Sequence, residues 1–137
     1  MKLTDFKALT FDVYGTLIDW ETGMVQGLTP LTDKVGGLTR DQILEAHAHH
    51  ESTTQAYTPA KTYSDILAVV YKRLAEEWGV PVAGDECLTY GASVKDWPAF
   101  PDSAEALAYL KQHYKLEVLS NVDYASFAHT NAKLGVT

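Results

Sequence analysis

Cysteine and long apolar runs are scarce in this sequence. It has one cysteine, Cys87, in 137 residues, so an intramolecular disulfide is excluded. We interpret Cys87 as a small buried residue, because no basic residue lies close to it in sequence. No apolar run reaches the roughly 18 residues of a membrane span, and the N-terminus lacks the basic-then-apolar pattern of a signal peptide. We therefore expect a cytoplasmic protein without membrane contact.

Positive charge is also scarce. The chain has 11 lysines and arginines against 18 aspartates and glutamates, which gives a formal net charge of −7 at pH 7. Arg40 and Arg73 are its only arginines, and lysines and arginines form no cluster. We therefore expect no binding to nucleic acid. An anionic small-molecule substrate would need a local positive pocket.

Hydrophobic patterning predicts two strands separated by a long helical segment. We expect strands at 6–13 and 116–120, and helices at 21–35 with a break near Gly27 and Pro30, 39–55, 62–78, 83–95, 102–114 and 124–134. Cap signatures open two of these helices, at Thr39 and Asp102. The connection between the strands far exceeds one βαβ unit. We therefore predict an α/β fold with a parallel-sheet core at 1–19 and 98–137 and a helical cap domain inserted at 20–97.

Polar residues follow both predicted strands. Asp12 stands where the first strand stops before a turn signal, and Ser120 and Asn121 end the second strand. Ligands bind at the carboxyl ends of strands in open α/β sheets, so parallel neighbours would bring these side chains to one crevice. A buried unpaired carboxylate is costly, and we predict a working role for Asp12 rather than an ordinary turn position. Ser120 and Asn121 offer neutral hydrogen bonds to an anion, while Asn121 or Asp123 could also cap the next helix.

These features resemble a known family. The segment Asp12-Val13-Tyr14-Gly15-Thr16-Leu17, the helical insertion, Trp97-Pro98 through Asp102, and Leu119-Ser120-Asn121 are similar to the haloacid dehalogenase (HAD) superfamily. More narrowly, they resemble its type II (S)-2-haloacid dehalogenases. The resemblance extends over essentially the whole chain. It implies a Rossmann-like HAD core with an inserted α-helical cap.

Tyr14 favours one branch of that superfamily on chemical grounds. Most members are phosphatases with a second aspartate at this position, which protonates the leaving oxygen, while the first aspartate helps to hold Mg²⁺. A neutral phenol supplies no carboxylate and is a poor ligand for a hard cation. A halide leaves without a proton. The Asp-x-Tyr pattern therefore fits carbon–halogen displacement, and we expect no cofactor and no metal.

The resemblance implies a hydrolase with a covalent mechanism. Asp12 would attack C2 of a short 2-haloacid, displace halide with inversion and form an ester that water then hydrolyses to the 2-hydroxy acid. The cap would exclude water, with Trp20 as a pocket wall. The residues implied to contact the substrate or the nucleophile are Val13 and Tyr14 through their amides, and Thr16, Ser120 and Asn121.

One departure from the family concerns the halide site. The family places an arginine on an early cap helix to receive the halide, but residues 43–51 contain none, and Arg40 stands at the start of this helix. His47, His50 and Glu51 share one face of the helix, which allows a metal site. We interpret this face more simply as solvated and polar.

A second departure concerns later motifs. The resemblance implies a lysine that pairs with the nucleophile, and further acidic or polar residues, which this sequence does not supply; Lys133 lies on a helix and out of order. We expect an N-terminal part of a longer protein whose sheet edges favour association, for example as a homodimer. Two alternatives stay open: a HAD-type phosphatase of a small metabolite, and a catalytically silent domain that acts by binding or association.

Overall fold

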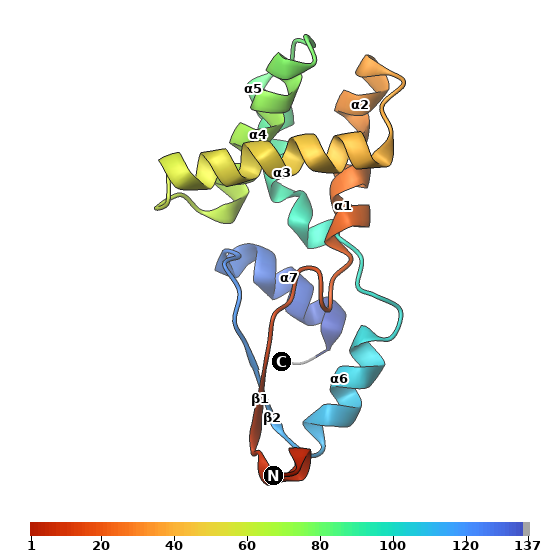
Figure 1. Ribbon diagram of the computed structural model, residues 1–137, viewed down its shortest axis with the longest axis vertical. Helices are drawn as coiled ribbons and strands as arrows, with labels where there is room; N and C mark the ends of the chain where they lie inside the picture. Colours follow the sequence, from red (N-terminus) through yellow and green to blue (C-terminus); the bar gives the residue numbers. More distant parts are fainter. Residues whose placement is uncertain (136–137) are drawn as a thin grey trace.

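The sheet joins the beginning of the chain to its last third. The computed structural model describes residues 1–135. In these residues β1 (Ala8–Phe11) pairs in parallel with β2 (Lys115–Val118), in register from the Ala8–Lys115 pair to the Phe11–Val118 pair. Because the strands are parallel, their carboxyl ends lie at the same edge of the sheet (Figure 1).

Helices occupy most of the chain between the strands. They are α1 (Trp20–Gly27), α2 (Thr29–Val35), α3 (Arg40–Tyr57), α4 (Tyr63–Glu77), α5 (Gly84–Gly91), the short 3-10 helix η2 (Ala92–Asp96) and α6 (Ser103–Lys111). A 3-10 turn, η1 (Leu3–Asp5), precedes β1, and α7 (Tyr124–Leu134) follows β2. Figure 1 shows α1 to α5 gathered at one end of the molecule, with the sheet, α6 and α7 at the other.

The predicted α/β fold with a helical insertion after the first strand is therefore confirmed. The boundaries that we placed at 19/20 and 97/98 stay predictions. Residues 136–137 of the predicted core lie outside the described residues. In the described part of the chain, no helix is both long enough and apolar enough to cross a membrane.

Both strands are shorter than predicted. The first was expected at 6–13 but ends at Phe11, because the carbonyl of Val13 accepts N–H bonds from Thr16, Leu17 and Ile18 at 3.2, 2.7 and 3.0 Å. These bonds curl the chain into a tight loop directly after the strand. The second strand, expected at 116–120, ends at Val118. Asp12 and Ser120 thus belong to loops at the sheet edge rather than to the strands.

One of the two predicted helix caps forms its hydrogen bonds. At α3 the Thr39 hydroxyl accepts the N–H of Gln42 at 3.2 Å, and the Gln42 side chain accepts the N–H of Thr39 at 3.0 Å. The cap expected at Asp102 is wrong, because this side chain makes no capping bond to α6. The first residue of that helix, Ser103, is buried, and its hydroxyl donates to the carbonyl of Leu17 at 2.7 Å.

Trp97 joins the helical end of the molecule to the sheet end. Its side chain is 2% exposed, and its ring meets those of Tyr14 and Tyr63 edge-on at centroid distances of 5.9 and 6.3 Å. A Cβ atom on Gly23 of α1 would overlap the indole. The carbonyl of Trp97 accepts a hydrogen bond from Lys133 Nζ of α7 at 2.7 Å. Three separate segments therefore pack around the side chain of Trp97, a fourth binds its carbonyl, and Lys133 has a structural partner.

Candidate active site

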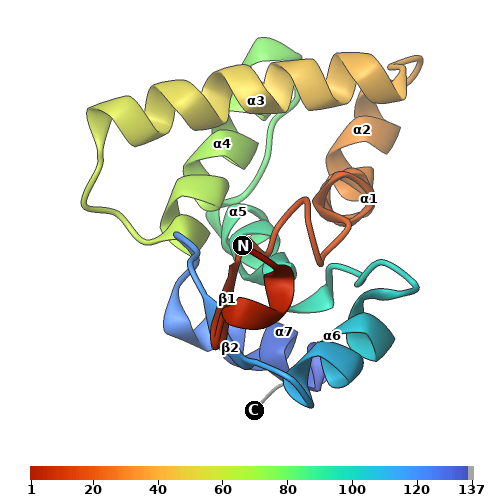
Figure 2. The same ribbon diagram turned by 60° about the horizontal axis from the view of Figure 1, so that its bottom comes forward.

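The predicted nucleophile and its expected partners line one cleft. This cleft has a volume of about 200 Å³, and its walls are Asp12 and Tyr14 after β1, Ser120, Asn121 and Val122 after β2, and Glu51, Gln55 and Tyr63 from α3 and α4. Its lining residues come from the loops that follow β1 and β2 and from α3 and α4. Figure 2 shows these strands and helices from a second direction. The parallel pairing of β1 and β2 accounts for the meeting of the two loops.

Asp12 is exposed at the sheet side of this cleft. Its Oδ2 atom accepts a hydrogen bond from the Thr16 hydroxyl at 2.9 Å. Thr16 itself does not line the cleft, and the side chain of Val13 is completely buried beneath the loop. The loop therefore fixes one carboxylate oxygen of Asp12. The catalytic role of Asp12 and the binding roles of Val13, Tyr14, Thr16, Ser120 and Asn121 stay predictions.

Tyr14 stands two residues after Asp12 and is held by α7. Its hydroxyl is hydrogen-bonded to Thr130 Oγ1 at 2.9 Å. Burial raises the pKa of Tyr14, and the charge of Asp123 adds to the rise, while the bond to Thr130 opposes it. The phenol is therefore neutral at physiological pH. This position offers the cleft a neutral hydroxyl and ring surface, not a second carboxylate.

The loop after β2 contains both a helix cap and cleft residues. Ser120 Oγ accepts the N–H of Val122 at 3.3 Å, which makes a local turn, and Asn121 reaches the cleft wall. Asp123 is the cap of α7 and also accepts a hydrogen bond from Ser64 of α4 at 2.6 Å. Burial would raise the pKa of Asp123, but hydrogen bonds, led by that from Ser64, outweigh burial and lower it. The cap interpretation is thus confirmed for Asp123, while anion binding by Ser120 and Asn121 stays a prediction.

The face of α3 that we interpreted as solvated is buried instead. The side chain of His47 is 0% exposed, and its Nε2 atom is hydrogen-bonded to the Tyr90 hydroxyl at 2.7 Å. Burial, reinforced by His50, lowers the pKa of His47 to about 3, so its ring is neutral. Residues 1–135 contain no cluster of three or more His, Cys, Asp or Glu side chains arranged to hold a metal ion. His47 on this face is therefore buried, and His50 and Glu51 beside it are half-buried.

Glu51, Gln55 and Tyr63 are the cleft residues that sequence reasoning missed or placed elsewhere. Burial raises the pKa of Glu51, and a hydrogen bond from Tyr63 partly opposes the rise. The spacing of Ile43, His47 and Thr54, all buried, marks the inner face of α3. This helical spacing is present in the sequence. However, polar side chains occupy three positions on or beside the buried face, so a search for a stripe of apolar residues does not find it.

Neither arginine reaches the cleft. Arg40 NH2 lies 3.5 Å from Glu21 with its side chain 53% exposed, and Arg73 pairs with Glu76 at 3.2 Å. The expectation that Trp20 forms a pocket wall is wrong, since this residue does not line the cleft. Its indole packs over Gly15, where a Cβ atom would come within 2.9 Å of it.

A second cavity, of about 380 Å³, adjoins the cleft. It shares Gln55, Tyr63 and Asn121 with the cleft and is also lined by Lys61 from the turn between α3 and α4. Lys61 is the cation in the walls of these two cavities, as far as the structure describes them. An anion that enters through this opening would meet one positive charge beside several neutral hydrogen-bond donors.

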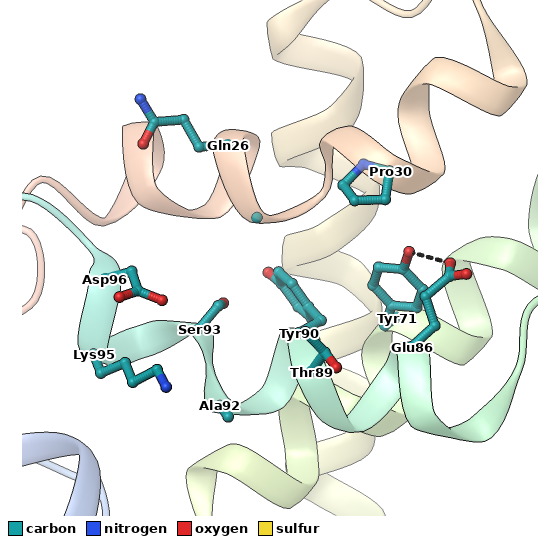
Figure 3. A pocket seen from close by; sticks show the side chains of 11 residues that line it. Gln26, Pro30, Tyr71, Glu86, Thr89, Tyr90, Ala92, Ser93, Lys95 and Asp96 are labelled. Carbon is teal, nitrogen blue, oxygen red and sulfur yellow. Dashed lines mark hydrogen bonds between the residues drawn. The ribbon is translucent and has the colours of Figure 1, made fainter.

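A further cavity, larger than the cleft, lies away from the sheet, among the helices. It has a volume of about 430 Å³ and is bordered by the end of α1, the start of α2, α5 and η2 (Figure 3). Tyr71 donates a hydrogen bond to Glu86 at 2.5 Å on its wall, and Tyr90 lines it too. None of the residues predicted to form the site lies here. Tyr90 links this cavity to α3 through His47, which stands next to Glu51.

Comparisons with known proteins identify the fold of the chain that forms this cleft. No protein-family model and no curated protein matches the sequence. The structure is similar to the L-2-haloacid dehalogenase PA0810, with a TM-score of 0.78 and 20% identity, over 96% of this chain and 59% of that one. It is similar to the L-2-haloacid dehalogenase from Xanthobacter autotrophicus with chloropropionic acid covalently bound, with a TM-score of 0.75 and 18% identity, over 96% and 53%.

A third similar structure carries a metal. YfnB from Bacillus subtilis, named as a HAD-hydrolase and bound to magnesium, matches with a TM-score of 0.68 and 18% identity over 96% of this chain and 60% of that one. The chain spans 53% to 60% of the length of these three structures. Their identity to this sequence is low, so the likeness concerns the fold. The chain therefore has the Rossmann-like fold of the haloacid dehalogenases.

Proposed function

We propose that the protein is a hydrolase of the haloacid dehalogenase type that acts on a short (S)-2-haloacid. The observation that carries this proposal is the loop Asp12 to Thr16. It presents one oriented carboxylate to a cleft, while the position two residues later holds a neutral phenol engaged with Thr130. The loop thus offers a candidate nucleophile, and the position two residues later holds no carboxylate that could protonate a phosphate ester's leaving group.

In the proposed reaction a carboxylate oxygen of Asp12 attacks C2 of the haloacid. The new carbon–oxygen bond forms as the carbon–halogen bond breaks, and the halide leaves with the bonding electron pair, so that C2 is inverted. Water then cleaves the ester and releases the 2-hydroxy acid. The hydrogen bond from Thr16 occupies Oδ2 and leaves Oδ1 as the attacking atom.

The substrate carboxylate is bound by neutral donors and one cation. Ser120, Asn121 and Gln55 provide hydroxyl and amide groups on the cleft wall. The backbone amides of Val13 and Tyr14 add the donors that the family resemblance implies. Lys61 at the adjoining cavity supplies one positive charge towards the substrate carboxylate. The helices α3 and α4 form the cap that excludes bulk water. The dehalogenase with covalently bound chloropropionic acid supports an ester intermediate in this fold.

The test is the ester itself. We expect incubation with (S)-2-chloropropionate to release chloride and to increase the mass of the Asp12 peptide by that of the acid less hydrogen chloride. Asp12→Asn should release no chloride, because a neutral amide is not a nucleophile here. Asp33→Asn, which changes an exposed aspartate on α2, should behave as the unchanged chain does. Chloride release by Asp12→Asn at the rate of the unchanged chain would contradict the mechanism.

Magnesium separates this proposal from a phosphatase. The similar structure with bound magnesium keeps that alternative in view. If EDTA abolished turnover, or if a small phosphate monoester were hydrolysed and the haloacid were not, the phosphatase would replace the dehalogenase. If neither substrate reacted and no adduct formed, a domain that acts by binding or association would be the remaining function.

A further inference from the structure

A second carboxylate faces the cleft from the helical side. Glu51 belongs to α3, and its side chain is 19% exposed and lines the same cleft as Asp12. No lysine, arginine or histidine lines the cleft in the part of the chain that the structure describes. A carboxylate held in this place is desolvated without a compensating cation. Stability does not explain such a group, which is typical of a working side chain.

Two groups hold Glu51 in position. The Tyr63 hydroxyl hydrogen-bonds to its carboxylate from α4. The Nδ1 atom of His47, one turn earlier on α3, lies 3.8 Å from Glu51 Oε2 and has no hydrogen-bond partner in the described residues. The opposite ring nitrogen of His47 is fixed by Tyr90 at 2.7 Å. Glu51 therefore stands between a donor at the cleft wall and a buried imidazole behind it.

The second half of the proposed reaction needs a base that Asp12 cannot be. Once Asp12 carries the ester, its carboxylate is consumed, and Glu51 is the carboxylate left on the cleft wall within residues 1–135. The tyrosines cannot replace it, because burial raises the pKa of both Tyr14 and Tyr63 and keeps them protonated. A water molecule occupies about 30 Å³, so the cleft of about 200 Å³ has room for it beside a short ester.

We propose that Glu51 is the general base that activates water to hydrolyse the Asp12 ester. Glu51 takes one proton as the water oxygen bonds to the Asp12 carbonyl carbon. The bond from that carbon to the ester oxygen then breaks, and Glu51 returns the proton to the departing 2-hydroxy acid. The second proton of the water stays on the new Asp12 carboxyl group and is released to solvent, which restores the Asp12 carboxylate and balances atoms and charge. The proposal rests on the proposed function, since it requires an ester at Asp12.

The experiment separates the two halves of the reaction. The variant Glu51→Gln keeps the size of the side chain and an acceptor for Tyr63 but cannot take the proton. We expect it to release about one chloride per chain, to keep the ester on Asp12, and to hydrolyse that ester at least about 100-fold more slowly than the unchanged chain. Glu45→Gln, an exposed position on the same helix, is the matched control and should turn over normally.

Each other outcome has a distinct meaning. Continuous turnover by Glu51→Gln at the unchanged rate would overturn the base role while leaving the dehalogenase proposal intact. Failure of Glu51→Gln to release even one chloride, with a normal circular dichroism spectrum, would also overturn it, because Glu51 would then act before the ester forms. If the unchanged chain released no chloride and formed no adduct, the proposed function would fail first and the base role with it.

Discussion

At the scale of single residues, His47 is the group whose environment differs most from expectation. Its ring is fully buried, donates to or accepts from Tyr90, and is surrounded by α3, α4 and α5. The charged and titratable groups that bear on it are His50, Glu51 and Tyr90. Burial holds its pKa near 3 in the fold against 6.5 for a free histidine. Folding therefore has to keep this ring unprotonated.

This pKa difference makes stability depend on pH in a defined direction. The unfolded chain binds a proton at His47 below pH 6.5, and the folded chain does so only near pH 3, so stability is full above pH 6.5 and falls as the pH drops through this window. The expected loss is about 2 kcal/mol between pH 7 and pH 5. His47→Gln, which keeps a partner for Tyr90, should remove this slope in urea unfolding. Parallel pH profiles of both proteins would contradict the prediction.

Whether a residue of the candidate site could be predicted from the sequence depended on its chemical type and its local sequence context. Asp12, Ser120 and Asn121 were predictable, because a polar residue directly after an apolar strand marks the functional edge of a parallel sheet. Glu51 and His47 were not, because polar residues on a helix face are normally solvated and nothing local signals their burial. Only the packing of α4 and α5 over α3 takes these side chains out of water.

At the scale of elements, a glycine makes a close contact between two helices. Gly91, the last residue of α5, is buried, and a Cβ atom here would overlap the carbonyl oxygen of Ser64 on α4. Gly84, the first residue of the same helix, has no atom within 4 Å of such a Cβ. The two positions therefore differ in packing while sharing one helix.

This difference gives a paired prediction. Gly91→Ala should lower the free energy of unfolding by about 1–3 kcal/mol, because an added methyl group forces α5 away from a rigid backbone atom. Gly84→Ala should leave it unchanged or raise it by up to about 1 kcal/mol through helix propensity. Urea midpoints at constant slope would measure both. Equal midpoints for the two variants would show that the α4–α5 contact adjusts freely.

Helices and strands were predicted well where the deciding pattern lies within one element. They were predicted poorly where contacts between elements decide the structure. The apolar face of α4 and the capping box of α3 come from spacing within one helix, and both are present. The end of β1 was predicted too late because the turn that follows Val13 stops the strand early. The capping bond expected from Asp102 is absent, and the Ser103 hydroxyl instead donates to the carbonyl of Leu17, far away in the sequence. That long-range bond leaves no trace in the sequence around Ser103.

At the scale of the whole molecule, the sheet has little cover. Each of its two strands pairs on one side only within residues 1–135. Apolar side chains beside it are exposed, among them Phe6 at 47%, Val118 at 39% and Leu119 at 75%. Unpaired strand edges with apolar neighbours are templates for pairing with another chain.

We therefore expect self-association through the sheet, and a single charge should weaken it. Leu119→Lys places a cation at the end of β2, where a second copy would have to bury it without a partner. Sedimentation velocity over a concentration series should show association of the unchanged chain and a shift towards monomer for this variant. Leu88→Lys changes a residue on α5 that is 64% exposed, far from the sheet in Figure 1, and should leave association as it was. If both lysine variants dispersed the protein equally, net charge rather than the strand edge would control its association.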